Sequence, residues 1–508
     1  MAVLNGADNQ EKFNYPLLTA NNNHHPGEPW MKFIGRTAEL EVLQSLAANP
    51  LAVATITGRR RVGKSRLVSE YAERTGKTLI RIDGRDAPRA NNKMQLRAFA
   101  NDLSRDTGIP GFSFSDWNAA FNGLGTLSKG KQWVILLDEI TWLAKYSDEC
   151  LAELKVFIDT HINGSDNQLI ICGSISQWIE EFINQSDSFV GRISKKIHLS
   201  PLPLPDCAKF WQDREVSTTE ILTALCVTGG IPRYLEEIDV SESAEWNIQK
   251  LCFDSPGYMV HELPNLIKSS FLQAERRDTV ERYLNILGTL AEHGKTPAEI
   301  SKAIKIENNE HLKNNLTSLV MSGIVSENPS WNLKSKAFNQ RNIVYRIDDP
   351  YTRFYIKYIR PNLNEIEKGL YSHLTLRQLG GWETIRGFQF QSLVNQSMIP
   401  FVTNRLKLTN LPIRRCGPYY RKKTSRHPAV QIDYLLQTDD TLYVCETKFR
   451  KKINTSVIDE VKKKIENLEK PKGITVRRVL LYSGQRTQEL TDSIYFDHQI
   501  RVDELLEL

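Results

Sequence analysis

Short apolar runs alternate with helical stretches over the first two hundred residues of the chain. Four runs have the length and β-branching of buried strands. They are LAVATIT before Gly58, TLIRID at Thr78–Asp83, WVILL before Asp138 and QLIICGS at Gln168–Ser174. Helical periodicity separates them, most clearly in RLVSEYAERT after the first run. We therefore predict an α/β fold built on a doubly wound parallel sheet.

Helical patterns dominate the middle of the chain. A segment from Asp206 to Leu225 leads to GGIPRYL, where Gly-Gly-x-Pro ends one helix and starts another. From Asp278 three short helices precede two strand-like runs, IVSENP and IVYRI. This order is typical of a winged helix-turn-helix, in which Lys313 and Asn314 would face outward from the third helix. A helical lid or a dimerisation module without DNA contact fits the pattern equally well.

The first strand-like run ends in a phosphate-binding signature. Residues Thr55–Ser65 read TITGRRRVGKS and match G-x-x-x-x-G-K-[ST] between a strand and a helix. Glycines let successive N–H groups face a polyphosphate, Lys64 reaches the β- and γ-phosphates, and the Ser65 hydroxyl binds Mg²⁺. The sequence therefore predicts a nucleotide site rather than an ordinary glycine turn. Its predicted lining is Gly58, Arg59, Arg60, Arg61, Val62, Gly63, Lys64, Ser65 and Arg66.

Acidic and small polar residues follow two later strands. Asp138 and Glu139 stand at the carboxyl end of WVILL, where open α/β sheets bind ligands. We predict that Asp138 holds Mg²⁺ and that Glu139 orients the attacking water, with a strand that merely ends in surface carboxylates as the alternative. Ser174, at the end of the next run, is placed to sense the γ-phosphate. Arg192 is a candidate for stabilising charge in the transition state, although a plain surface arginine fits equally well.

A second group of charged residues lies near the end of the chain. VQIDYLLQTDDTLYVCETKF has two strand-like runs around a turn, with Asp433 on the first and Glu446 and Lys448 on the second. The period of two places Glu446 and Lys448 on one face, and a hairpin brings Asp433 beside them. Asp433 and Glu446 are candidate Mg²⁺ ligands for attack on a phosphodiester, with Lys448 stabilising the developing charge. An edge strand with alternating charges is the simpler alternative.

Composition narrows the choice of partner and compartment. Net charge is only +6, but the stretch Thr384–Ile432 contains nine Lys and Arg and no Asp or Glu. Tyr419 and Tyr420 stand among these basic residues, a pattern typical of nucleic-acid contact, with a solvated loop as the alternative. Seven scattered cysteines without a C-x-x-C pair argue against disulfides and zinc and favour a cytoplasmic location. No run is long enough to span a membrane, and no signal-peptide pattern opens the chain.

Several blocks together resemble a known family. FIGRTAEL, GRRRVGKS, ILLDE, ICGS and GGIPRYL, in that order, look like the archaeal-type ATPases of the signal-transducing (STAND-like), AAA-related P-loop branch. The downstream pattern is similar to members that carry a C-terminal DUF234 domain, which resembles PD-(D/E)xK restriction-type nucleases. The resemblance implies ATP and Mg²⁺ as cofactors. It also implies that Gly35 and Arg36 lie near the nucleotide and that Pro232 packs on the adenine. One departure is Gln391, which stands where that nuclease group often has a glutamate.

These observations predict a multidomain chain of six segments. They are a polar, flexible tail (1–32), a P-loop ATPase core (33–205), a helical lid (206–277), a winged helix (278–347), a helical linker (348–376) and a restriction-endonuclease-like α/β domain (377–508). Our primary hypothesis is an ATPase whose nucleotide state controls a DNA-binding, Mg²⁺-dependent nuclease domain. The rival is a non-cleaving, ATP-dependent switch or DNA-binding regulator. The sequence leaves open a homo-oligomer, and whether Arg192 acts within its own subunit or on a neighbour.

Overall fold

The computed structural model describes residues 32–86, 90–174, 176–271, 277–333, 338–408, 412–423, 425 and 427–506. The predicted tail lies almost entirely outside these residues, and so does Arg426 of the basic stretch. Residues 34–508 form one unit. No helix among the described residues has the length and apolar character needed to cross a membrane.

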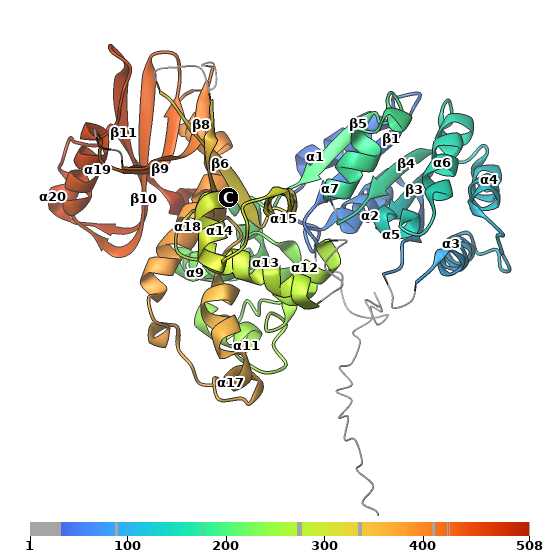
Figure 1. Ribbon diagram of the computed structural model, residues 1–508, viewed down its shortest axis with the longest axis horizontal. Coiled ribbons are helices and arrows are strands. Elements are labelled where there is room, and N and C mark those ends of the chain that lie inside the picture. Colours follow the sequence, from blue (N-terminus) through green and yellow to red (C-terminus); the bar gives the residue numbers. More distant parts are fainter. Residues whose placement is uncertain are drawn as a thin grey trace, which may run out of the picture. The chain divides into compact units, whose positions relative to one another are not determined.

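A five-stranded parallel sheet organises the first part of this unit (Figure 1). Its strands follow the order β2-β3-β4-β1-β5, and every neighbouring pair is parallel. The strands are β1 (Val53–Gly58), β2 (Thr78–Asp83), β3 (Trp133–Asp138), β4 (Gln168–Cys172) and β5 (Lys195–Leu199). The predicted parallel sheet is confirmed. Strand β5 was not predicted, because KKIHL alternates exposed and buried positions at the edge of the sheet instead of forming an apolar run.

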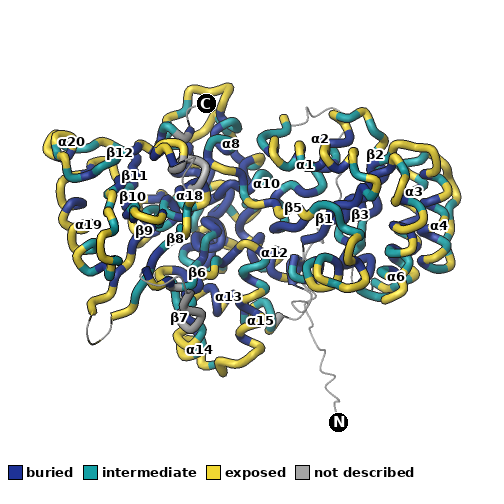
Figure 2. Tube along the Cα trace, turned by 90° about the horizontal axis from the view of Figure 1, so that it is seen from above, coloured by how far each residue is buried: buried dark blue, intermediate teal, exposed yellow. Residues whose placement is uncertain are grey.

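Helices cover both faces of this sheet, and two of them begin at a capping side chain. They are α1 (Thr37–Leu46), α2 (Lys64–Thr75), α3 (Asn92–Thr107), α4 (Trp117–Ser128), α5 (Ile140–Ala144), α6 (Asp148–Phe157) and α7 (Ser176–Ile179). The side chains of Asn91 and Asp116 accept hydrogen bonds from backbone N–H groups three residues later, which fixes where α3 and α4 begin. Figure 2 shows buried strands and exposed outer sides of α3, α4 and α6.

The middle of the chain is mainly helical, as its sequence indicated. Its helices are α8 (Leu204–Ala208), α9 (Thr218–Thr228), α10 (Pro232–Leu235), α11 (Ala244–Cys252), α12 (Glu262–Ser270), α13 (Arg277–Leu290), α14 (Pro297–Ile304) and α15 (Glu310–Met321). Thr296 and Glu299 form a capping box at the start of α14. An antiparallel pair follows, β6 (Val325–Trp331) with β7 (Phe338–Ile347).

Three helices connect this region to a second sheet: α16 (Pro350–Phe354), α17 (Leu363–Glu367) and the long α18 (Trp382–Arg405). One apolar core runs from Leu202 in the middle region through α16 and α18 to one face of the second sheet, ending at Leu506. The connecting helices are therefore part of a continuous interior, so a displacement of α16 would be felt at the second sheet.

The second sheet is mixed and has the order β12-β11-β10-β9-β8. Its strands are β8 (Arg415–Arg421), β9 (Val430–Gln437), β10 (Thr441–Ile453), β11 (Thr475–Arg486) and β12 (His498–Arg501). Strand β10 pairs antiparallel with β9 and parallel with β11. The helices α18 and α19 (Ser456–Glu466) lie on opposite sides of the sheet (Figure 1) and belong to separate apolar clusters. The short α20 (Gln488–Thr491) precedes β12.

Candidate functional site

The predicted phosphate-binding loop joins β1 to α2. The Lys64 ammonium is buried and donates to the carbonyl oxygens of Gly58 (3.0 Å) and Arg59 (3.3 Å) and to the Ser174 hydroxyl (3.0 Å). Arg61 and Gly63 have positive φ angles of 75° and 95°, which curl the backbone before the helix begins. The loop and the end of β4 thus hold the lysine between them.

Close approach explains the first glycine of the signature. A Cβ atom on Gly58 would lie 2.5 Å from the backbone carbonyl oxygen of Leu199 on β5. The Gly58 N–H donates to the Ser176 hydroxyl over 3.1 Å. Gly63 faces Pro232, whose Cγ lies 4.0 Å from the position of a Cβ on that glycine. Pro232, which the family resemblance assigned to the adenine site, therefore stands beside the loop.

Asp138 lies next to the start of α2. Its Oδ2 accepts hydrogen bonds from the Ser65 hydroxyl (2.5 Å) and from the Arg81 guanidinium on β2 (2.9 Å). Burial raises the pKa of the Asp138 carboxyl, and the charge of Arg81 opposes this shift. Sequence reasoning missed Arg81. Its position on β2, beside β3 in the sheet, was the available signal.

Glu139 and Ser174 lie on adjacent strand ends and contact each other. The Glu139 carboxylate accepts from the Ser174 backbone N–H (3.1 Å) and from its hydroxyl (2.5 Å). Glu139 has a positive φ of 51°, and α5 follows it directly. Because Ser174 also accepts from Lys64, one serine connects the lysine of the loop with the glutamate.

The residues before α1 also reach the loop. Arg36 is buried and donates to the carbonyl oxygen of Val62 over 3.1 Å. Burial lowers the pKa of its guanidinium, although Glu39 opposes the shift. Gly35 has a φ of 72°, and a Cβ there would lie 2.4 Å from a carboxylate oxygen of Asp206. The structure thus places Arg36 against the phosphate-binding loop and Gly35 against α8.

Two arginines of the loop point toward the middle region. Arg59 forms an ion pair with Asp349, just before α16, and donates to the Tyr234 hydroxyl over 3.1 Å. Arg61 pairs with Glu262 of α12 over 3.1 Å. Asp349 and Glu262 were not predicted, because they are far from the loop in sequence. Arg60 and Arg66 are half-buried at the loop.

Arg192 does not join this group within its own chain. Its guanidinium forms a two-pronged ion pair with Asp159 at 2.8 and 2.7 Å and also donates to the Ser188 carbonyl. An arginine so engaged faces a carboxylate instead of a phosphate. The structure therefore gives no support to a role of Arg192 within its own subunit, and action on a neighbouring subunit stays a prediction.

The donor atoms suit Mg²⁺ held together with a nucleotide. A hydroxyl on Ser65 and a buried carboxylate on Asp138 are the oxygen ligands that Mg²⁺ prefers. Among the described residues, no three His, Cys, Asp or Glu side chains gather into a metal site made by protein alone. This fits an ion that takes one or two protein ligands and completes its shell with phosphate and water.

The second predicted group also comes together. Lys448 donates to Glu446 Oε1 over 2.8 Å, and both side chains lie on β10. Asp433 on β9 is tied to β10 because its Oδ2 accepts from the N–H and the hydroxyl of Thr447, each over 2.9 Å. Burial, and then the charge of Asp433, raise the pKa of the Glu446 carboxyl.

Helix α19 adds two charged side chains that sequence reasoning missed. Lys464 donates to Glu446 Oε2 over 2.5 Å and lies 3.9 Å from Asp433 Oδ1. Glu460, one turn earlier, accepts from Lys448 over 2.7 Å. Both Glu446 oxygens are thus engaged by ammonium groups. As the residues stand, this group does not fit a divalent ion shared by Asp433 and Glu446.

Gln391 of α18 lies beside this group without entering it. Its side-chain amide donates to the backbone carbonyl of Asp433 over 3.4 Å, as does that of Asn395. The glutamine therefore supports β9 and adds no carboxylate to the pair formed by Asp433 and Glu446.

Acidic residues from elsewhere in the chain compensate much of the positive charge of the acid-free stretch 384–432. Five of its basic residues pair with acids from outside the stretch: Arg386 with Glu383, Arg405 with Glu504, Arg414 with Asp439, Arg421 with Glu469 and Lys422 with Glu299. Tyr419 is buried edge-on against Trp331, with ring centroids 5.6 Å apart. Tyr419 therefore does not present its ring to nucleic acid, and contact through the rest of the stretch stays a prediction.

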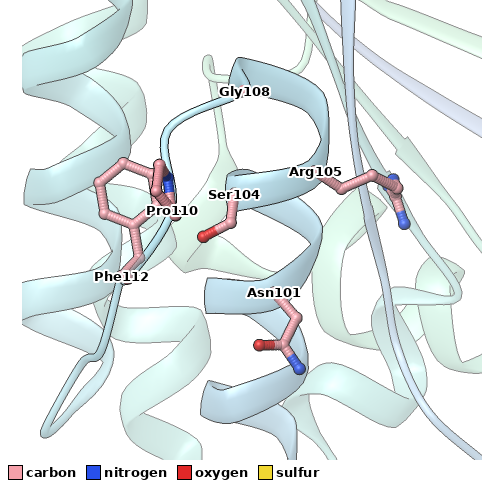
Figure 3. Close-up of a pocket in the computed structure, with 7 residues that line it drawn as sticks. Asn101, Ser104, Arg105, Gly108, Pro110 and Phe112 are labelled. Carbon is pink, nitrogen blue, oxygen red and sulfur yellow. The ribbon is translucent and has the colours of Figure 1, made fainter.

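A surface cavity of about 590 Å³ lies at the end of α3 (Figure 3). Figure 3 shows Arg105 pointing away from the Phe112 ring, and Arg105 is paired with Asp102 and Asp106. The cavity therefore lacks converging charged groups and adds nothing to the two sites above.

Comparison with known proteins shows a family similarity in the first part of the chain. Residues 33–238 match a family described as an ATPase domain predominantly from Archaea. This segment is similar to the P-loop ATPase domains of that family. The corresponding sequence prediction is confirmed at this level. The match ends at residue 238, so the nuclease-like nature of the C-terminal part stays a prediction.

Individual proteins resemble longer parts of the chain. MJECL04, an uncharacterized protein of Methanocaldococcus jannaschii, is 24% identical over 418 residues, which cover 80% of this chain and 85% of the relative. The Walker-type ATPase PABY2304 of Pyrococcus abyssi is 19% identical, with a TM-score of 0.48 over 64% of this chain and 96% of its own. The ORC2 protein of Aeropyrum pernix, in complexes with ADPNP and ADP, is 16% identical, with a TM-score of 0.39. That match covers 69% of this chain and 97% of the ORC2 chain.

Proposed function

We propose that this chain binds and hydrolyses ATP and that its nucleotide state controls a DNA-binding, nuclease-like C-terminal domain. The observation that carries the ATPase part is the chain of contacts from Lys64 through Ser174 to Glu139. It joins the group that would hold a γ-phosphate to the group that would position an attacking water. The family match at residues 33–238 supports the same activity.

Each residue then has a physical task. Backbone N–H groups of the loop and the start of α2 bind the phosphates, and Lys64 neutralises their charge. Ser65 and Asp138 would hold Mg²⁺, which neutralises charge on the β- and γ-phosphates when it is bound. Glu139 orients and polarises the water, and Ser174 keeps that carboxylate beside the phosphate position.

A lysine-to-alanine change tests the nucleotide site. We expect Lys64→Ala to abolish measurable ATP binding in calorimetry, because the buried ammonium supplies the main positive charge of the loop. Lys131→Ala is the matched control, since Lys131 is an exposed lysine of the same domain. Unchanged ATP affinity in Lys64→Ala would overturn the assignment of this loop.

Control of the C-terminal domain rests on contacts between the loop and α16. Arg59 ends in an ion pair with Asp349, and α16 begins at the next residue. Arg353 of α16 donates to Gln389 of α18 over 2.6 Å, and Gln389 donates to the Pro350 carbonyl over 2.6 Å. A nucleotide that moves the loop would thus act directly on the helices beneath the second sheet.

The DNA-binding part has two lines of support. Asp433, Glu446 and Lys448 converge on β9 and β10, as a D…E-x-K nuclease site requires. The helices α13–α15 followed by β6 and β7 have the order of a winged helix, and Lys313 on α15 is 71% exposed. We expect Lys313→Ala to weaken binding of duplex DNA in a fluorescence anisotropy titration, with a smaller salt dependence than wild type.

A second candidate is a non-cleaving, ATP-dependent switch. It is favoured by the engagement of both Glu446 oxygens by lysines and by the glutamine at position 391. A cleavage assay distinguishes the nuclease from the switch. The protein is incubated with supercoiled or linear DNA, ATP and either Mg²⁺ or Mn²⁺. Cleavage by wild type that is lost in Lys448→Ala supports the nuclease. Equal inactivity of both proteins with retained DNA binding supports the switch.

A further inference from the structure

Lys464 occupies an unusual place in the C-terminal group. Its ammonium lies 2.5 Å from Glu446 Oε2 and 3.9 Å from Asp433 Oδ1, between the two carboxylates that would share a cation. Its side chain is 24% exposed, and that of Glu446 is 2% exposed. The contact is therefore sheltered from water, and its electrostatic attraction is only weakly screened.

The other oxygens of this group are already engaged. Glu446 Oε1 accepts from Lys448, and Asp433 Oδ2 accepts from the backbone N–H and hydroxyl of Thr447. The atoms left for a shared ligand are Glu446 Oε2 and Asp433 Oδ1, and these two are the ones that face Lys464. A divalent ion bound by both carboxylates would need the space that the ammonium fills.

Charge explains why the lysine stays there. Asp433 and Glu446 are close enough to repel each other, and an uncompensated pair of buried carboxylates is costly. The Lys464 ammonium faces both carboxylates and compensates their charge. Lys448 contacts the other oxygen of Glu446 and is shared with Glu460, so it does not take this role.

We propose that Lys464 is a built-in cation that blocks the divalent metal site formed by Asp433 and Glu446, and that it must swing out before a metal ion binds there. This inference rests on the proposed nuclease-like nature of the C-terminal domain. Helix α19 lies over the sheet and carries the lysine near its C-terminal end, so the side chain can withdraw toward solvent without a change in the strands. Lys464 is thus a residue that sets metal affinity, and not one that touches substrate.

Mn²⁺ binding to the full chain tests this without any measurement of activity. Mn²⁺ is titrated in the absence of nucleotide and followed by electron paramagnetic resonance of the free ion. We expect Lys464→Met to bind one Mn²⁺ about tenfold or more tightly than wild type, because a competing charge has been removed. Addition of Glu446→Gln to that variant should abolish the gain, which assigns it to this site and not to Asp138.

Two control variants test whether the gain in Mn²⁺ affinity is specific to Lys464. Lys448→Met removes the other lysine on Glu446, and Lys462→Met removes an exposed lysine of the same helix. Neither should produce the gain. Lys464→Gln replaces Lys464→Met if the latter does not give the circular dichroism spectrum of wild type. Equal Mn²⁺ affinity in Lys464→Gln and wild type, or an equal gain in Lys448→Met, would overturn the proposal.

Failure of this inference and failure of the proposed function give different results. A gain in Mn²⁺ affinity without DNA cleavage by any variant retains the role of Lys464 and rejects the nuclease. DNA cleavage by wild type, together with no gain in Lys464→Met, retains the nuclease and rejects the role of Lys464.

Discussion

Arg59, in the phosphate-binding loop, forms a buried ion pair with Asp349, a residue 290 positions later in the chain. Each side chain is only 3% exposed. Asp349 also accepts from the backbone N–H of Thr352, so the same carboxylate caps α16. The loop that would bind phosphate and the helix that leads toward the second sheet therefore share one carboxylate.

Removal of either charge should be costly. We expect Arg59→Met and Asp349→Asn each to lower the free energy of unfolding by about 3–5 kcal/mol, because the remaining partner stays buried without its counter-charge. Urea unfolding of both single variants and the double variant measures the coupling between them. Arg233→Met is the control, since Arg233 is 42% exposed and an exposed pair contributes about 1 kcal/mol or less. Additive losses in the double variant would contradict a direct ion pair.

Local sequence patterns predicted those strands and loops whose conformation depends on residues close together in the sequence. The strand at Thr78–Asp83 and the phosphate-binding loop follow from apolar runs and glycine spacing within a few residues. The Arg59–Asp349 pair could not be predicted, because no sequence pattern near Arg59 or near Asp349 indicates that the two side chains meet in the fold. Lys464 was missed for a related reason. It follows two other lysines on α19, and only the packing of that helix on the sheet decides which one faces Glu446.

Glu139 should separate ATP binding from hydrolysis. Glu139→Gln keeps an oxygen that accepts from Ser174 but cannot polarise a water as a carboxylate does. We therefore expect ATP affinity close to wild type and a hydrolysis rate lower by about 10²–10⁴-fold. Release of inorganic phosphate measures the rate, and calorimetry measures the affinity. A hydrolysis rate equal to that of wild type would exclude Glu139 as the group that positions water.

Two glycines with positive φ provide a matched comparison. A Cβ on Gly58 would collide with the Leu199 carbonyl on β5, whereas a Cβ on Gly76, at the end of α2, meets nothing within 4 Å. Gly76→Ala should cost about 1–2 kcal/mol from backbone strain alone. Gly58→Ala should cost more and also weaken ATP binding, because β5 must shift where the loop begins. Urea midpoints and ATP titrations measure both effects, and equal losses of stability in the two variants would contradict the predicted clash.

Stability should depend on the protonation of His198, which lies on β5 beside β1. His198 keeps part of its surface exposed at the edge of the sheet, but the partial burial of its ring, and then the nearby charge of Lys64, hold the pKa of this histidine below its usual 6.5. The folded chain therefore binds fewer protons here than the unfolded chain, so the free energy of unfolding falls as the pH drops below about 6.5. His198→Gln removes the titrating group and keeps a polar partner for Thr57. Between about pH 7.5 and about pH 5.5, the range in which histidine titrates, urea unfolding should show a smaller loss in this variant than in wild type. Bound ATP should reduce the difference, because its negative charge near Lys64 offsets the added proton. An identical pH dependence in both proteins would show that His198 is not a source of the acid sensitivity.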